Sequence, residues 1–218
     1  MSTTPTQETK LTFRRFKEGN NKVRPHDKIF QAGHSYKCPT YIQSTPPCQG
    51  SCPAGEDIRR YLQIARGMEK PPVGADGKPS MPWQEYAWRV LTEANPFPSV
   101  MGRVCPAPCE SGCNRNEVED HVGINSVEHF LGEYAIQNKL KFNKPDVKPS
   151  GKKVAVIGGG PAGLSCAYQL VRMGHAVTIF DEHEQLGGMM RYGIPGFRTP
   201  RHILDAEIQR ILDLGVKV

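Results

Sequence analysis

The chain has no apolar run that approaches the ~18 to 20 residues needed to cross a membrane as a helix. Its opening stretch, MSTTPTQETKLTFRRFKEG, lacks the apolar core of a secretory signal. These absences predict a protein without a membrane span, located in the reducing environment of the cytoplasm.

Concentrated positive charge is also missing. The 28 Lys and Arg exceed the 22 Asp and Glu by only six, and the excess is spread along the chain without a basic tract that contains aromatic residues. The seven His, like the Ser and Asp residues, show neither a triad nor a metal-ligand spacing. The sequence therefore predicts no nucleic-acid partner and no side chain that performs acid–base catalysis.

Cysteine, in contrast, is frequent and clustered. Six of the seven cysteines fall into two groups, made of Cys38, Cys48, Cys52, Cys105, Cys109 and Cys113. Grouped thiols in a reducing compartment are more often metal ligands than disulfides. The seventh, Cys166, lies in an apolar helical stretch, and we expect it to be a small buried packing residue.

The spacings typical of structural zinc, paired cysteines two residues apart or a histidine pair, are absent. The two groups read CQGSCP over residues 48–53 and CPAPCESGC over residues 105–113. Because proline fixes φ and removes a backbone donor, we expect these thiols on stiff irregular loops and not on helices. Such loops are typical of iron–sulfur clusters. A zinc-stabilised nucleotide-binding protein remains the alternative.

An abrupt change of composition divides the chain into two parts. Residues 1–142 read as a helical, loop-rich iron–sulfur domain whose small core is supplemented by metal. Residues 143–152 form a linker rich in Pro, Lys and Gly, and residues 153–218 read as an incomplete Rossmann-like domain with a parallel sheet. The predicted fold class is therefore α+β and multidomain.

Local patterns place the elements of the first part. Residues 1–30 are polar and predict an extended arm. Residues 56–66 and 83–93 predict amphipathic helices. A third helix is expected to be capped by Asn125 or Ser126.

The second part contains a glycine turn between a strand and a helix. A buried strand over residues 153–157 runs into GGGPAG at 158–163, then a helix and a second strand over 175–180 that ends at Asp181. In this context, Gly158 permits the tight turn, Gly160 the approach of a pyrophosphate, and Gly163 close packing of helix on strand. Asp181 is positioned to accept from ribose hydroxyls. A parallel domain without a ligand is the alternative.

A second glycine pair, Gly187 and Gly188, soon after the acid favours FAD over NAD. No Cys-x4-Cys occurs, so a thiol–disulfide flavoenzyme is not expected. The residues predicted to bind the cofactor are Gly158, Gly160, Pro161, Ala162, Gly163, Asp181, Gly187, Gly188 and Arg191.

Together these stretches, with NPFP at residues 95–98 and GGMMRYGIP at 187–195, resemble the small (beta) subunit family of NADPH-dependent glutamate synthase and the N-terminal part of dihydropyrimidine dehydrogenase. The resemblance runs from Lys28 to the last residue. It implies hydride transfer from NAD(P)H to FAD, then single electrons through two 4Fe-4S clusters to an electron-acceptor subunit or domain, within a hetero-oligomer. A non-enzymatic module that docks and wires a separate catalytic subunit is the rival interpretation.

The resemblance also implies how the thiols divide. One cluster would take Cys38, Cys48 and Cys113, and the other would take Cys52, Cys105 and Cys109. For the second cluster, relatives place Gln or Glu on the following helix, where this chain has Glu128; a surface carboxylate is the other interpretation. For the first, Tyr41 lies near the position of a cysteine in relatives, which leaves open a non-cysteine ligand, a three-iron form or no cluster.

Length is a second departure from the family. A helix capped by Thr199 and Pro200 leads into a third strand, and the chain stops at Val218. Because so short a Rossmann part cannot enclose FAD and would expose an apolar sheet edge, we expect an N-terminal fragment of a longer protein.

Overall fold

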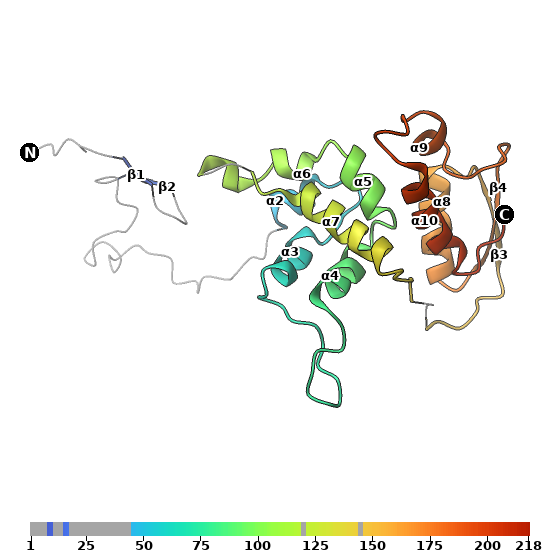
Figure 1. The fold of residues 1–218 in the computed structure, drawn as a ribbon, viewed down its shortest axis with the longest axis horizontal. Helices are drawn as coiled ribbons and strands as arrows, with labels where there is room; N and C mark the ends of the chain where they lie inside the picture. The colour runs from blue at the N-terminus through green and yellow to red at the C-terminus, as the bar shows by residue number, and fades with distance from the viewer. Residues whose placement is uncertain (1–7, 11–14, 18–44, 119–120, 144–145) are drawn as a thin grey trace, which may run out of the picture.

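The computed structural model describes residues 8–10, 15–17, 45–118, 121–143 and 146–218 (Figure 1). The elements follow one another as β1 (Glu8–Lys10), β2 (Arg15–Lys17), α2 (Pro47–Ser51), α3 (Ile58–Ala65), α4 (Trp83–Leu91), α5 (Pro98–Val104), α6 (Pro108–Ser111), the 3-10 helix η1 (Asn114–Glu117), α7 (Ile124–Gln137), β3 (Lys153–Ile157), α8 (Pro161–Arg172), β4 (Ala176–Phe180), α9 (Met189–Tyr192) and α10 (Arg201–Leu212). Within these residues no helix combines the length and apolar character that a bilayer crossing requires.

Helices α3, α4 and α7 enclose the first hydrophobic core. Tyr61, Trp88 and Leu131, one from each helix, are fully buried. The two helices predicted over 56–66 and 83–93 are confirmed with slightly shorter bounds. In α3 the start is set by Asp57, whose side chain accepts from the N–H of Arg60 at 3.3 Å.

Helix α5 packs against α7 through glycines. A Cβ on Gly132 would lie 2.3 Å from the backbone nitrogen of Ser99, and a Cβ on Gly102 would lie 2.5 Å from the Cβ of His129. Any side chain at either position would push the helices apart. Because Cys105 directly follows α5, this close contact also fixes where the second cysteine segment begins.

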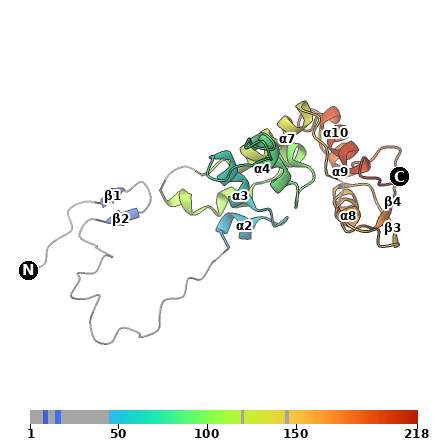
Figure 2. The ribbon, with the colours of Figure 1, turned by 90° about the horizontal axis from the view of Figure 1, so that it is seen from below.

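The second part of the chain is a parallel strand–helix–strand unit. Strands β3 and β4 pair in parallel, with α8 as their connection, in a register that joins Lys153 to Ala176 and Ile157 to Phe180. The predicted third strand begins with a parallel bridge between Thr178 and Lys217. This arrangement confirms the Rossmann-like part of the predicted fold class in its coarse form, a parallel strand–helix–strand unit that follows a helical part (Figure 2).

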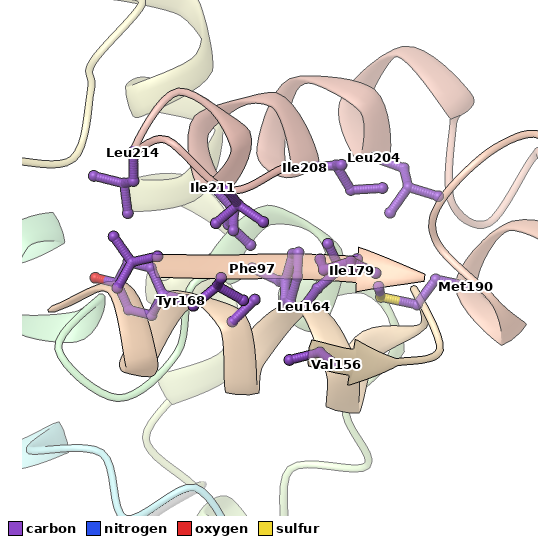
Figure 3. Packing of buried hydrophobic residues seen from close by; sticks show 14 of the residues in the cluster. Phe97, Val156, Leu164, Tyr168, Ile179, Met190, Leu204, Ile208, Ile211 and Leu214 are labelled. Atoms are coloured by element: carbon purple, nitrogen blue, oxygen red, sulfur yellow. The ribbon is translucent and has the colours of Figure 1, made fainter. Parts of the chain in front are cut away.

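A second hydrophobic core contains residues from both parts of the chain. Phe97 and Val100 of the helical part are buried in the same cluster as Leu164 of α8, Ile179 of β4 and Leu204 of α10 (Figure 3). Side chains of α8 also bind the carboxyl end of α4, since the hydroxyl of Tyr168 donates to the carbonyl of Thr92 at 2.7 Å. The nucleotide-type unit is therefore packed directly against the cysteine-bearing unit.

Several local expectations differ from the structure. The arm expected over residues 1–30 contains a short antiparallel pair, β1 with β2; its other residues lie outside the described ranges. The expected Asn125 or Ser126 cap is wrong. Helix α7 begins at Ile124, and the carboxylate of Glu110 accepts from the N–H of Asn125 at 2.8 Å and takes the place of a local cap.

Two further expectations, about the cap of α10 and the burial of Cys166, also differ from the structure. Pro200 occupies the N-cap position of α10 as expected, but Thr199 makes no capping bond, and its hydroxyl is buried without a described partner. Cys166 is exposed, not buried, because α8 turns Leu164, Ala167 and Tyr168 toward the core and leaves residue 166 on the opposite side. Apolar neighbours in sequence did not reveal which face of each helix is covered.

Candidate functional site

Short helical turns carry two of the thiols. Cys48 lies within α2, Cys109 lies within α6, Cys52 and Cys105 directly follow α2 and α5, and Cys113 directly precedes η1. The expectation of irregular loops was wrong for Cys48 and Cys109. Pro47 and Pro108 begin these helices, because proline's fixed φ suits the first helical position and its missing N–H has no helical partner there.

A sharp bend brings the second cysteine segment back on itself. Ala107 adopts the left-handed conformation, with φ 52°, and its N–H donates to the Sγ of Cys105 at 3.4 Å. Such a conformation is unfavourable for alanine, so the surrounding structure must hold it. The bend turns Cys109 toward the same cavity as Cys105.

The three predicted ligand thiols, Cys52, Cys105 and Cys109, border a single cavity of about 250 Å³ together with the predicted carboxylate ligand, Glu128. A single water needs only about 10–15 Å³. Within the described part of the chain, no three His, Cys, Asp or Glu side chains are gathered tightly enough for one metal ion. The thiols instead surround a space that they share.

Burial makes this cavity unfavourable for negative charge. It raises the pKa of Cys109 to about 12, and the nearby Cys105 and Glu110 add to this effect. It also raises the pKa of Cys105, with Glu128 and Cys52 contributing repulsion. These thiols can lose their protons together only beside a cationic centre, and the iron of a cluster provides one. The donor set therefore fits a 4Fe-4S cluster.

Glu128 belongs to the interior. The residue is only 5% exposed, so its interpretation as a surface carboxylate is wrong. Burial, reinforced by repulsion from Glu56 and Glu207, raises the pKa of Glu128 to about 9.

Sequence reasoning missed two other buried polar residues at the cavity, Glu56 and Asn95. The Nδ2 of Asn95 donates to Glu56 at 3.0 Å and to Glu128 at 2.5 Å. No described Lys, Arg or His forms an ion pair with either carboxylate. Asn95 belongs to the NPFP stretch, but nothing in that stretch indicated that its side chain would be buried between two carboxylates.

The other predicted thiol group is only partly described. Cys48 lies close enough to Cys113 for the two to interact electrostatically, and burial, opposed by the N–H of Gln49, raises the pKa of Cys48. Cys38 and Tyr41 lie outside the described residues. The structure thus brings together two of the three thiols assigned to that cluster.

The glycine turn has the geometry that the fingerprint predicts. Gly158 has φ 102°, and a Cβ on Gly163 would lie 1.8 Å from the carbonyl oxygen of Gly158. Gly188, with φ 48°, lies so close that its Cβ would be 2.7 Å from the Cα of Gly160. The N–H of Gly187 donates to the carbonyl of Gly159 at 2.7 Å. The two glycine segments therefore form one cradle at the start of α8, which fits a dinucleotide pyrophosphate.

The remaining predicted nucleotide residues surround this cradle. Asp181 accepts from the N–H of Gly159 at 2.5 Å and of His183 at 2.9 Å, and these bonds lower its pKa. Arg191 donates to the carbonyl of Leu186 at 2.6 Å and pairs with an aspartate of α10. Pro161 and Ala162 are the first two residues of α8.

We expect Gly163→Ala to weaken FAD retention at least tenfold, because its Cβ would overlap the carbonyl of Gly158 and displace α8 from β3. The control is Gly196→Ala, since a Cβ there meets nothing within 4 Å. Flavin content after gel filtration of both variants measures the effect. Equal flavin content in the two would show that the turn does not hold the nucleotide.

The cavity and the cradle are adjacent. Ser165, one turn into α8, borders the cavity of the three thiols. The helix whose first residues form the nucleotide cradle thus also closes the space between the thiols.

Comparisons with known proteins agree with this geometry. Residues 79–140 match the family described as dihydropyrimidine dehydrogenase domain II, 4Fe-4S cluster. Residues 156–214 match the NAD(P)-binding Rossmann-like domain. Fold and site together define a protein of the class that combines an iron–sulfur domain with a nucleotide-binding domain.

Individual relatives narrow this class. The chain is 40% identical to glutamate synthase (NADH) of Schizosaccharomyces pombe over 205 residues, 93% of this chain and 9% of that protein. It is 33% identical to the NAD-dependent dihydropyrimidine dehydrogenase subunit PreT of Salmonella typhimurium over 79% of this chain and 38% of that protein. It is 35% identical to the glutamate synthase (NADPH) small chain of Mycobacterium tuberculosis over 79% of this chain and 32% of that protein.

The chain therefore belongs to the family of iron–sulfur oxidoreductase chains that includes the glutamate synthase small chain, as its cysteine and glycine stretches predicted. It spans between 9% and 38% of the length of these three relatives.

Proposed function

We propose that this protein is an NAD(P)H-dependent oxidoreductase, or the electron-transfer subunit of one, that holds FAD and two 4Fe-4S clusters and supplies electrons to a partner subunit or domain. When bound, FAD accepts a hydride from NAD(P)H and releases its two electrons singly, and the clusters conduct single electrons. The observation that carries the proposal is the thiol-lined cavity closed by Ser165 of α8, the helix that starts at the glycine cradle.

In this proposal the thiols divide as the family resemblance implies. Cys52, Cys105 and Cys109 hold one cluster, with Glu128 as the fourth ligand. The proximity of these residues around one cavity supports the assignment. The other cluster is held by Cys38, Cys48 and Cys113.

The nucleotide residues have positioning and binding roles. The backbone N–H groups at the start of α8, beside Gly160 and Gly188, bind the pyrophosphate of FAD. Asp181 fixes the turn by accepting from Gly159 through Oδ2 and from His183 through Oδ1, and its place after β4 supports a role beside the ribose. Arg191 holds the segment that carries Gly187 in place. Phe97 of the cysteine-bearing part is buried in the same cluster as Leu164 of α8, and this packing supports a short path between the two sites.

To test this proposal, the full-length protein is purified without oxygen and mixed with NADPH or NADH, and reduction of its cofactors is measured. We expect iron, sulfide and FAD in the product, and bleaching of the flavin absorbance on addition of NADPH or NADH. An electron paramagnetic resonance (EPR) signal from reduced clusters should follow.

Other outcomes separate the alternatives. Clusters that do not respond to either nucleotide would support the non-enzymatic wiring module. Zinc without iron in elemental analysis would support the zinc-stabilised nucleotide-binding protein, and it would overturn the proposal.

A further inference from the structure

The two buried carboxylates at the thiol cavity are joined by one amide. Glu56 and Glu128 are each 5% exposed and Asn95 is 6% exposed. Both hydrogens of the Asn95 amide are used, one on the Oε1 of each carboxylate, at 3.0 Å and 2.5 Å. All three side chains border the cavity that Cys52 and the other two thiols share.

The orientation of the amide is fixed by the backbone. The Oδ1 of Asn95 accepts from the N–H of Phe97 at 2.9 Å. Because a backbone N–H only donates, Oδ1 must face it, and Nδ2 must face the carboxylates. The amide therefore cannot turn over, and Glu56 and Glu128 each have one oxygen committed to it.

This arrangement restricts Glu128 more than a single hydrogen bond would. A glutamate on α7 has freely rotating side-chain bonds, and a bond from Asn95 removes much of that freedom. Asn95 is in turn held between Phe97 and Glu56. Glu56 follows Cys52 closely in sequence, so the chain Glu56–Asn95–Glu128 links the first cysteine segment to α7 across the cavity.

We propose that Glu56 is a positioning residue which, through Asn95, holds the carboxylate of Glu128 toward the iron of the Cys52, Cys105 and Cys109 cluster. The inference rests on the proposed function, because it takes Glu128 as the fourth ligand. One oxygen of Glu128 stays on Asn95, and the other is left for iron. In this proposal Glu56 acts only through Asn95.

The experiment compares Glu56→Ala, which removes the acceptor, with Glu56→Gln, whose amide oxygen can still accept from Asn95. Protein from the complete gene is purified without oxygen and treated with ferricyanide. Conversion of the cluster to its three-iron form is followed by EPR. An insecurely held non-cysteine ligand should release its iron first.

We expect Glu56→Ala and Glu128→Ala both to convert at least tenfold faster than the wild type and to show altered g values in the reduced cluster. Glu56→Gln should behave as the wild type. Glu93→Ala, which removes an exposed carboxylate two residues from Asn95, is the matched control. Melting temperatures of all variants identify any that fail to fold, and the signal of the other cluster is the internal reference.

The outcomes distinguish this inference from the proposed function. If Glu56→Ala keeps the wild-type rate and g values, or if Glu56→Gln fails to restore them in a folded protein, the positioning role is wrong. If Glu128→Ala also leaves the cluster unchanged, Glu128 is not a ligand and the inference fails together with that ligand assignment, while the proposed electron-transfer activity stands. A wild-type protein without any cluster would overturn both.

Discussion

Cys105→Ala is expected to remove the iron and sulfide of one cluster, about half of the total when both clusters are present. The thiol directly follows α5, whose position against α7 is set by close glycine contacts. Its cluster would then be left with two cysteine ligands, fewer than biological clusters generally have. Because metal binding contributes to folding, the melting temperature should fall as well.

Cys166→Ala is the matched control for this prediction. Cys166 is exposed on α8 and does not border the thiol cavity, so its replacement should leave the iron content unchanged. Iron and acid-labile sulfide per chain, measured on protein purified without oxygen, give the comparison. Equal losses in both variants, or none in either, would contradict the assignment of Cys105.

Local patterns predicted the elements that this site uses. The glycine turn and the helices over 58–65 and 83–91 depend on neighbours within one or two turns, so their signals survive in the sequence. Gly158 and Gly163 could be assigned roles because a positive φ and a close approach each require glycine.

Distant contacts could not be predicted in this way. The bond from Asn95 to Glu56 joins residues 39 apart, and that from Ser99 to Glu207 joins residues 108 apart. Nothing in the periodicity of α10 distinguishes the fully buried Glu207 from a surface glutamate. The burial of Glu128 and the exposure of Cys166 could not be predicted for the same reason, because each depends on which elements pack over the helix.

Glu207→Ala should lower the free energy of unfolding by about 3 to 5 kcal/mol. Glu207 is fully buried on α10 and accepts from the N–H of Ser99 at 2.8 Å and of Val100 at 3.0 Å. These donors belong to the first turn of α5, which has no cap from its own preceding side chain. Truncation leaves both donors unpaired at about 1 to 3 kcal/mol each. It also leaves Arg210, 3.9 Å from Glu207, without its buried counter-charge.

Gln209→Ala is the matched control, since Gln209 is an exposed residue on the same helix as Glu207. It should change the free energy of unfolding by no more than about 0.5 kcal/mol. Urea denaturation followed by circular dichroism measures both variants. A small effect of Glu207→Ala would mean that α5 and α10 do not depend on this carboxylate for their contact.

The same carboxylate predicts a pH dependence. Burial raises the pKa of Glu207 from 4.5 to about 7, against the opposing effect of the two N–H donors and Arg210. A raised pKa means that the folded protein binds the proton more tightly than the unfolded chain. The stabilisation is therefore complete below pH ~4.5 and is lost as the pH rises through about 7.

Glu207→Gln has no proton to lose at this position. Relative to this variant, the wild type should lose about 3 kcal/mol of unfolding free energy between pH 4.5 and 8. Urea titrations of both proteins at a series of pH values give the difference. A difference that stays constant across this range would show that Glu207 keeps one protonation state, and that its charge, not its proton, links α10 to α5.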